Sequence, residues 1–226
     1  MAPKISLICH VDVIIIGSGG HAAELADYIN FSNSLENKKE KISVLGLIDD
    51  NIENYIKYDF QSPFLGEIKT HQTRPDVHYI IGVANLEYRK IFVELFLKQG
   101  AKFFSYVHPS VSISSTAKIG QGVVICPNAN LGPNTYVGDF SLVNSRVSLG
   151  HDSKIGKFNF LSPNVCFSGC TEVGDENLFG INSATIPGIR IGDRNKIMAG
   201  MILEKNVGND EVIFYRYKEK IHVIKT

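Results

Sequence analysis

Residues 118–156 read KIGQGVVICPNANLGPNTYVGDFSLVNSRVSLGHDSKIG, and an apolar residue returns at every sixth position of this stretch. The same register extends in both directions without an insertion, and sixteen of its seventeen positions are apolar. A hydrophobic content of 44% would give roughly seven or eight by chance, so the period is typical of a hexapeptide β-helix. The positions are Val107, Ile113, Ile119, Ile125, Leu131, Val137, Val143, Leu149, Ile155, Leu161, Phe167, Val173, Phe179, Thr185, Ile191, Ile197 and Leu203.

Each period of six predicts one short strand and one corner, and three periods close a triangular coil of eighteen residues. The repeat therefore predicts a little over five coils, stacked ~4.8 Å apart into a prism roughly 25 Å tall. The seventeen repeating residues are expected to point inward. Val123, Val147 and Val165 are expected on the outer surface, with the alternative that some turn inward. Glycine follows the repeating residue at eight corners, where a side chain would crowd the backbone or φ must be positive. These corners are 120, 132, 138, 150, 156, 174, 180 and 192.

The first hundred residues have a different pattern, in which short apolar runs alternate with helical periodicity. This alternation predicts a small parallel α/β domain. Asn85 has the position of a helix N-cap and Gly100 that of a C-cap, with one apolar face on the helix between them. That face carries Ile91, Phe92, Leu95 and Phe96. The predicted strands are 13–16, 44–48, 79–83 and 101–107, and the predicted helices are 23–29 and 86–99.

The glycine-rich loop after the first predicted strand fits a phosphate site. Gly17, Gly19 and Ala22 have the G-x-G-x-x-G/A spacing, which lets a diphosphate approach the backbone at a helix N-terminus. The second strand ends at Asp49 and Asp50, where an acid could hold a ribose or a base. A nicotinamide cofactor is disfavoured, because ~100 residues leave no room for a second nucleotide half. His21 is equally suited to a structural hydrogen bond and to a phosphate contact.

His151 follows a corner glycine in the repeat, and Asp152 is next to it. A histidine with a carboxylate partner suits general-base chemistry near neutral pH, although a solvated corner residue is the alternative. The only histidines in the prism are His108 and His151, so no metal site is expected. The four cysteines form no CxxC pair, and Cys166 is expected to be buried filling without an adjacent base.

The composition excludes several classes of protein. The chain has 23 basic and 23 acidic residues, which argues against nucleic-acid or anionic-membrane binding by bulk charge. No run of 18 apolar residues is present, so no membrane insertion is expected. Residues 1–11 show no signal-peptide pattern, and the expected location is cytoplasmic.

The motifs together resemble a family of bacterial sugar O/N-acyltransferases that includes sialic acid O-acetyltransferases and N-acetyltransferases of nucleotide-linked 4-amino sugars. The resemblance spans residues 11–203. It rests on the segments 14–22, 46–50, 81–85 with Arg89, 151–152 with Asn144, and 180–183, in this order and combined with the hexapeptides. It implies a Rossmann-like nucleotide-sugar domain at residues 1–104, a left-handed β-helix at 105–203 and a C-terminal tail at 204–226.

The resemblance also implies roles for individual residues. His151 would be the general base and Asp152 an acid that orients it, in a direct attack of a sugar amine on acetyl-CoA. The backbone N–H of Gly169 would face the thioester carbonyl. Nucleotide-sugar contacts would come from Gly17, Gly19, Gly20, His21, Asp49, Asp50, Asn85, Arg89 and Asn144, and acetyl-CoA contacts from Gly169, Gly180, Ile181 and Ala199.

Two features depart from the family's pattern. Some members carry a second histidine nine residues after the base, where this chain has Phe160. The family's closing Gly-Val-Pro-Ala motif is missing, and residues 214–218 stand in that region.

The resemblance implies an acetyl-CoA-dependent N-acetyltransferase for surface polysaccharide or lipopolysaccharide assembly, with no tightly bound cofactor. An O-acetyltransferase of a sugar such as sialic acid and a non-catalytic nucleotide-sugar-binding regulator are the alternatives. A homotrimer is expected, because a single triangular prism offers no deep cleft for CoA.

Overall fold

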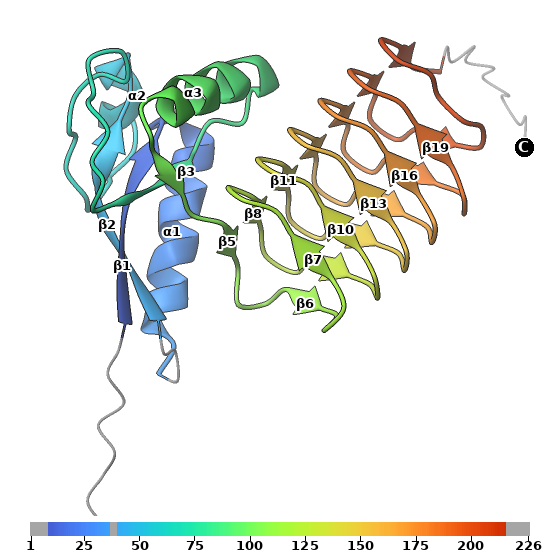
Figure 1. Ribbon diagram of the computed structural model, residues 1–226, viewed down its shortest axis with the longest axis horizontal. Coiled ribbons are helices and arrows are strands. Elements are labelled where there is room, and N and C mark those ends of the chain that lie inside the picture. Colours follow the sequence, from blue (N-terminus) through green and yellow to red (C-terminus); the bar gives the residue numbers. More distant parts are fainter. Residues whose placement is uncertain (1–8, 37–39, 216–226) are drawn as a thin grey trace, which may run out of the picture.

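The computed structural model describes residues 9–36 and 40–215. An α/β unit with two long helices lies at one end of a prism of stacked triangular coils, and the described chain ends at the far end of that prism (Figure 1). This architecture confirms the predicted fold class, a Rossmann-like domain followed by a parallel β-helix. Among the described residues, no helix has the length and apolar character needed to cross a bilayer.

The α/β domain is built on a four-stranded parallel sheet in the order β2-β1-β3-β4. Helices α1 and α3 cover its two faces: Val13 and Ile15 pack with α1, whereas Ile14 and Ile16 pack with α3. Because β1 is buried on both faces, it reads as a continuous apolar run. The elements are β1 (Cys9–Ile16), α1 (Gly20–Ser34), β2 (Glu40–Ile48), α2 (Ile52–Ile56), β3 (His78–Ile81), α3 (Leu86–Lys98) and β4 (Lys102–Phe103).

The predicted ends of α3 are confirmed, but its predicted apolar face is only partly right. Asn85 Oδ1 accepts a hydrogen bond from Tyr88 N at 3.1 Å, and Gly100 has φ +79° just beyond the helix. Ile91 is 49% exposed, and Arg89 and Val93 are buried beside Phe96 instead. The sequence did not predict the short helix α2, and the strand predicted at 101–107 is split into β4 and β5 (Tyr106–Val107).

The prism has three faces, each a parallel sheet to which every coil adds one strand (Figure 1). Face 1 contains β5 (Tyr106–Val107), β8 (Val124–Ile125), β11 (Leu142–Val143), β14 (Phe160–Leu161), β17 (Leu178–Phe179), β20 (Lys196–Ile197) and β22 (Val212–Ile213). Face 2 contains β6 (Ser112–Ile113), β9 (Asn130–Leu131), β12 (Ser148–Leu149), β15 (Cys166–Phe167), β18 (Ala184–Thr185) and β21 (Ile202–Leu203). Face 3 contains β7 (Lys118–Ile119), β10 (Tyr136–Val137), β13 (Lys154–Ile155), β16 (Glu172–Val173) and β19 (Arg190–Ile191).

Most repeating residues form the core of the prism as predicted, in one apolar cluster that runs along its axis; in the first coil, Val107 and Ile119 are only partly buried and Ile113 is 41% exposed. Thr185, the polar exception, is buried and hydrogen-bonded to Thr171 Oγ1 at 2.9 Å. The expectation that Val123, Val147 and Val165 lie outside is wrong. All three are buried in the same cluster, so each coil contributes corner valines as well as strand residues.

The corner glycines are explained by crowding. A Cβ at Gly150 would stand 2.6 Å from the backbone nitrogen of Gly169 in the next coil. The left-handed backbone conformation instead falls two residues later, at non-glycine residues such as Asp152 (φ 58°) and Cys170 (φ 59°). Each coil therefore approaches its neighbour closely at one corner position and turns at another.

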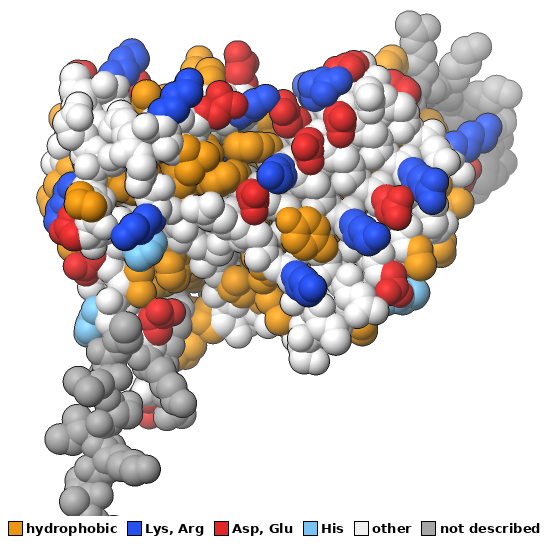
Figure 2. Space-filling model, viewed as in Figure 1, with side chains coloured by type: hydrophobic (Ala, Val, Ile, Leu, Met, Phe, Trp, Pro, Cys, Tyr) orange, Lys and Arg blue, Asp and Glu red, His pale blue; other side chains and the backbone are white. Residues whose placement is uncertain are grey.

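The two domains meet on face 1 and on the corner that joins face 3 to face 1. The outward residues of face 1 nearest the N-terminus, Tyr106, Val124 and Leu142, are buried against α1. Lys90 on α3 pairs with Glu176 on that corner at 2.7 Å. Figure 2 shows hydrophobic side chains gathered at this junction beneath a row of charged side chains. Apolar packing with an ion pair at its rim thus fixes the α/β domain on one side of the triangular prism.

Candidate active site

The residues singled out in the sequence fall into three groups in space. One group lies at the ends of β1, β2 and β3, where open α/β sheets bind ligands. A second group, Asn144, Gly180, Ile181 and Ala199, lies on the corner between faces 1 and 2. The third, His151, Asp152 and Gly169, lies on the corner between faces 2 and 3.

The glycine loop leads from β1 into α1. Gly17 has φ +96°, and a Cβ there would stand 2.7 Å from Val83 Cγ2, so the position requires glycine. Gly19 is the N-cap of α1 and has open space around it; it offers no side-chain cap, and the first turn has no acidic residue. The helix therefore begins with a positive dipole end that no side chain neutralises, which suits a phosphate group.

Asp49 supports this loop from the end of β2. Its carboxylate is buried and accepts hydrogen bonds from Ser18 N at 2.7 Å, from Ser18 Oγ at 3.0 Å and from Asn51 N at 2.9 Å. Asp50 accepts from Lys69 N at 3.1 Å. Sequence reasoning assigned both acids to the nucleoside, and the geometry adds a second duty for Asp49, which is to hold the glycine loop.

A hollow of about 410 Å³ opens beside these acids. Asn54, Tyr88 and Phe92 line it, and sequence reasoning missed all three. The rings of Tyr88 and Phe92 stack with centroids 6.1 Å apart. The signal available in the sequence was a pair of aromatic residues four positions apart on a helix next to the end of a parallel sheet. The residues that line the hollow are Asp49, Asp50, Asn51, Asn54, Ile68, Val83, Tyr88 and Phe92.

Arg89 lies in the junction between the domains and is fully buried. Its Nε donates to the Phe140 carbonyl at 2.9 Å, and Nη1 donates to the carbonyls of Ile81 and Val83 at 3.1 and 3.0 Å. Burial lowers the pKa of Arg89 to about 9, which still leaves the group charged at neutral pH. Sequence reasoning placed Arg89 among the substrate contacts. This position favours a different role, since the guanidinium ties the end of β3 to the β-helix.

His21 is also nearly enclosed, with 7% of its side chain exposed. Its Nδ1 lies 3.6 Å from Glu24 Oε2, and its Nε2 has no hydrogen-bond partner among the described residues. Burial lowers the pKa of His21, and the charge of Arg89 acts in the same direction, whereas Glu24 opposes both. The ring is therefore neutral at pH 7, with one nitrogen left to serve a ligand or a water molecule.

The buried state of His21 predicts that acid destabilises the protein. Because the folded pKa is lowered, the unfolded chain binds the proton more readily, and stability falls as the pH drops through about 6.5 toward the folded value. The Tm of the wild type should therefore fall more steeply between pH 7 and pH 5 than the Tm of His21→Asn. Parallel Tm curves for the two proteins over this range, measured calorimetrically, would show that the ring is not neutral and enclosed.

His151 and Asp152 form an exposed pair on the corner between faces 2 and 3. His151 Nδ1 lies 2.7 Å from Asp152 Oδ2, and the two side chains are 63% and 50% exposed. Asn134, one coil earlier, donates from Nδ2 to Asp152 Oδ1 at 2.9 Å. The Asn134 amide and then the His151 ring hold the pKa of Asp152 below its ordinary value. An ionised carboxylate at Nδ1 keeps the proton there and leaves the lone pair on Nε2.

Two further features bear on the chemistry of His151. A Cβ at Gly169 would stand 2.5 Å from His151 Nε2, so the imidazole lies directly against this glycine of the next coil. The N–H of Gly169 donates to no acceptor within the described part of the chain. Sequence reasoning missed Asn134, and the available signal was its spacing of eighteen residues before Asp152, which places both in one column of corners.

The corner between faces 1 and 2, which carries Asn144 and Ala199, lies beside an apolar hollow. Ala199 lines an apolar hollow of about 390 Å³ that the tail residues Phe214 and Tyr215 complete; residues 216–218, which are part of the predicted tail motif, lie outside the described residues. Asn144 Oδ1 accepts from Ser145 N at 2.7 Å.

Phe160 projects from face 1, where it packs against the cluster shared with α1. The aromatic ring therefore contributes to the domain junction.

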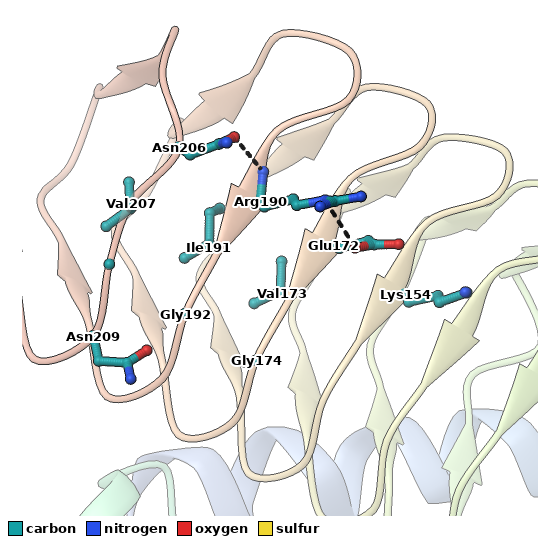
Figure 3. Close-up of a pocket in the computed structure, with 11 residues that line it drawn as sticks. Lys154, Glu172, Val173, Gly174, Arg190, Ile191, Gly192, Asn206, Val207 and Asn209 are labelled. Carbon is teal, nitrogen blue, oxygen red and sulfur yellow. Dashed lines mark hydrogen bonds and ion pairs between the residues drawn. The ribbon is translucent and has the colours of Figure 1, made fainter.

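A shallow hollow of about 560 Å³ on face 3 is separate from all three groups. Arg190 and Glu172 form an ion pair of 3.2 Å across it, and Asn206 accepts from Arg190 N (Figure 3). Its lining holds no histidine or cysteine and none of the candidate catalytic or substrate-binding residues. The size of a cavity therefore does not locate the reactive groups of this fold.

The described cysteines differ in exposure. Cys126 is buried, and burial raises the pKa of its thiol to about 12, so it carries no thiolate at neutral pH. The expectation that Cys166 is buried filling is wrong: it precedes a repeating residue on β15, points outward from face 2 and is exposed. Cys170 is exposed as well.

The α/β domain matches a known protein family, and part of the chain matches a curated relative. Residues 12–96 match the model of the PglD N-terminal domain family. The UDP-N-acetylbacillosamine N-acetyltransferase of Bacillus subtilis (strain 168) is 28% identical over 116 residues, and this chain spans about half the length of that relative.

Solved structures share the whole architecture. PerB from Caulobacter crescentus, in complex with CoA and GDP-perosamine, superposes with a TM-score of 0.76 at 20% identity, covering 89% of this chain and 92% of that chain. The acetyltransferase domain of PglB from Neisseria gonorrhoeae, in complex with acetyl coenzyme A, superposes with a TM-score of 0.77 at 22% identity, covering 89% and 96%. At these identities the likeness establishes the fold.

Proposed function

Residues 12–96 form a PglD N-terminal domain that precedes a left-handed β-helix, and on this premise we propose that the chain is an acetyl-CoA-dependent nucleotide-sugar N-acetyltransferase. The observation that carries the proposal is the His151–Asp152 pair, which Asn134 orients against Gly169. The activity named for the Bacillus subtilis relative and the ligands named for the PerB and PglB structures support the choice of substrates.

The α/β domain holds the nucleotide sugar in this proposal. The uncapped start of α1 at Gly19 takes the diphosphate, and the hollow beside Asp50, Tyr88 and Phe92 takes the nucleoside. The exposed ring of Tyr88 and the partly buried ring of Phe92 can stack on a nucleobase, and the carboxylates can accept its hydrogen bonds. Asn85 and Arg89 support this site from α3, as the N-cap of the helix and as a tie to the β-helix.

The triangular cross-section favours a site shared between chains. The α/β domain covers face 1, whereas His151 lies on the corner opposite that face. The base of the same prism therefore lies on the side away from the surface that the α/β domain covers. In a cyclic trimer, the His151 corner of one chain would meet the α/β domain and the Ala199 corner of its neighbour, which also excludes water from an otherwise exposed base.

The mechanism follows from the groups on the His151 corner. Asp152 keeps the proton on Nδ1, so Nε2 accepts a proton from the sugar amine as the amine attacks the thioester carbonyl of acetyl-CoA. The N–H of Gly169, which donates to no described acceptor, stabilises the developing oxyanion. Collapse of the tetrahedral intermediate releases the CoA thiolate, and the proton on Nε2 returns to it. No cysteine nucleophile is required.

Mass spectrometry of amino-sugar nucleotides incubated with acetyl-CoA tests the proposal. The expected product is heavier by one acetyl group on the amine, and it yields free CoA in equal amount. Acetylation of a hydroxyl in deaminated analogues would instead support an O-acetyltransferase, since the same base and oxyanion donor serve both nucleophiles. Nucleotide binding without product from any amino sugar would indicate a regulator.

The loop glycines predict a clean separation between binding and stability. Gly19→Leu places a side chain in open space with ordinary extended backbone, so the free energy of unfolding should change by about 1 kcal/mol or less. The same side chain fills the phosphate site and should weaken nucleotide-sugar binding at least about tenfold. Calorimetric titration with UDP, GDP and dTDP sugars measures the effect.

Gly17→Ala is the matched control in the same loop. It should destabilise the fold by about 1–3 kcal/mol because of its positive φ and its contact with Val83. Unchanged nucleotide affinity in Gly19→Leu would exclude this loop as the phosphate site.

A further inference from the structure

Cys170 lies beside the candidate base His151, although the two residues are far apart in the sequence. It follows Asp152 by eighteen residues, which is one full coil, so the two side chains occupy the same column of corners. Cys170 N donates to the His151 carbonyl at 2.9 Å, which fixes its backbone next to the histidine. Its thiol is exposed and forms no disulfide.

These three side chains bring three kinds of metal ligand together. A ring nitrogen of His151, a carboxylate oxygen of Asp152 and the sulfur of Cys170 all lie within 4.8 Å of one another. Zinc binds such donors at about 2.0–2.3 Å in tetrahedral geometry, which places neighbouring ligand atoms roughly 3.3–3.8 Å apart. All three side chains are exposed in the single chain, so small rotations can bring the sulfur closer and widen the 2.7 Å separation between His151 Nδ1 and Asp152 Oδ2. The fourth position is open to water.

A neighbouring side chain orients one of the three ligands, as is common around metal sites. Asn134 holds Asp152 through its other oxygen at 2.9 Å, so one ligand is oriented by a neighbour that does not bind the metal. The sequence expectation of no metal site considered the two histidines of the prism. It overlooked a mixed site because Cys170 and His151 are neighbours only through the coil stacking.

We propose that His151, Asp152 and Cys170 form a site for a thiophilic divalent cation such as Zn²⁺, and that its occupation inhibits the enzyme. Binding replaces the thiol proton, so one proton is released to solvent for each ion bound. The ion is an inhibitor rather than a cofactor. Whichever ring nitrogen it takes, Nε2 no longer offers a lone pair to the substrate, because the ion either occupies it or displaces the proton to it.

Metal binding to the full-length protein tests the first half of this proposal without any substrate. Titration of the chelator-treated protein with Co²⁺ should give a thiolate-to-cobalt charge-transfer band, and Zn²⁺ should displace it at one ion per chain. Cys170→Ala should lose the band and weaken Zn²⁺ binding at least about tenfold. Cys166→Ala is the matched control, since it removes an exposed thiol four residues away and should leave both properties unchanged.

The inhibition rests on the proposed function and is tested separately. Zn²⁺ should inhibit acetyl transfer by the wild type and by Cys166→Ala, and a chelator should restore the rate. Cys170→Ala, whose basal rate should be unchanged, should need at least about tenfold more Zn²⁺ for the same loss. Equal Zn²⁺ affinity in Cys170→Ala and the wild type overturns the site. Tight Zn²⁺ binding that depends on Cys170 but does not inhibit acetyl transfer overturns the proposal that the ion is an inhibitor. If the wild type shows no acetyl transfer at all, the proposed function fails, and the Zn²⁺ affinities of the two proteins still decide whether the metal site exists.

Discussion

His151→Ala should lower kcat for acetyl transfer by roughly 10²–10⁴-fold, the usual contribution of a general base. Without the imidazole, the attacking amine has no group that takes its proton, although both substrates can still bind. The fold should persist, because the side chain is 63% exposed and carries none of the prism's core packing. Steady-state kinetics with a nucleotide amino sugar and thermal unfolding of the same preparation measure the two effects.

Asp152→Asn is the graded companion of this variant. An amide keeps the size of the side chain but can no longer hold a proton on Nδ1 as a carboxylate does, so the loss of kcat should be smaller than for His151→Ala. A His151→Ala enzyme that retains more than half of the normal kcat would exclude the histidine as the base. A loss in Asp152→Asn that exceeds the loss in His151→Ala would contradict the proposed order of roles.

Two impaired variants should restore activity when they assemble together and are assayed at a nucleotide-sugar concentration below the weakened Kd of Gly19→Leu. His151→Ala keeps the nucleotide site, whereas Gly19→Leu keeps the base. If the base of one chain serves the sugar held by its neighbour, mixed trimers contain sites in which both halves are intact. Random mixing in equal amounts should restore about a quarter of the wild-type sites, because about three quarters of the trimers are mixed and about a third of the interfaces in each mixed trimer are intact.

The rate of acetyl transfer is measured for the two variants co-expressed as mixed trimers. It is compared with the rate of the two variants purified separately and combined under conditions in which subunits do not exchange. Sedimentation equilibrium should give about 75 kDa, three chains of 25.0 kDa. A site made within one chain would leave the mixed assemblies inactive. A monomer with full activity would likewise exclude the shared site, and the position of His151 opposite face 1 would then need a different substrate path.

The hexapeptide register determined most of the fold. An uninterrupted period of six favours a coil in which the repeating residues share one core, because a shifted register would expose that whole row of apolar side chains. The same holds for the glycine loop. The spacing of the loop predicted a tight turn between a strand and a helix, and Gly17 forms such a turn, where its positive φ and the closeness of Val83 require glycine.

The placement of the α/β domain came only from the tertiary structure. The period of six is identical for all three faces, so it cannot say which face the first domain covers. That choice is made by side chains outside any repeat pattern: Tyr106 and Leu142 pack against α1, and Arg89 donates to the backbone of β3 and to Phe140, 51 residues further along the chain. It puts His151 on the far corner, and the proposal of a shared site rests on that placement.

The surroundings of the candidate base also came from stacking. Asn134, Asp152 and Cys170 are eighteen residues apart and share no local motif, yet one coil height brings them into a single column. The sequence determined that the chain forms coils, since apolar periodicity is a local property of each six-residue unit. The tertiary structure decided which polar residues meet, because those contacts depend on which corner of the triangle each residue occupies.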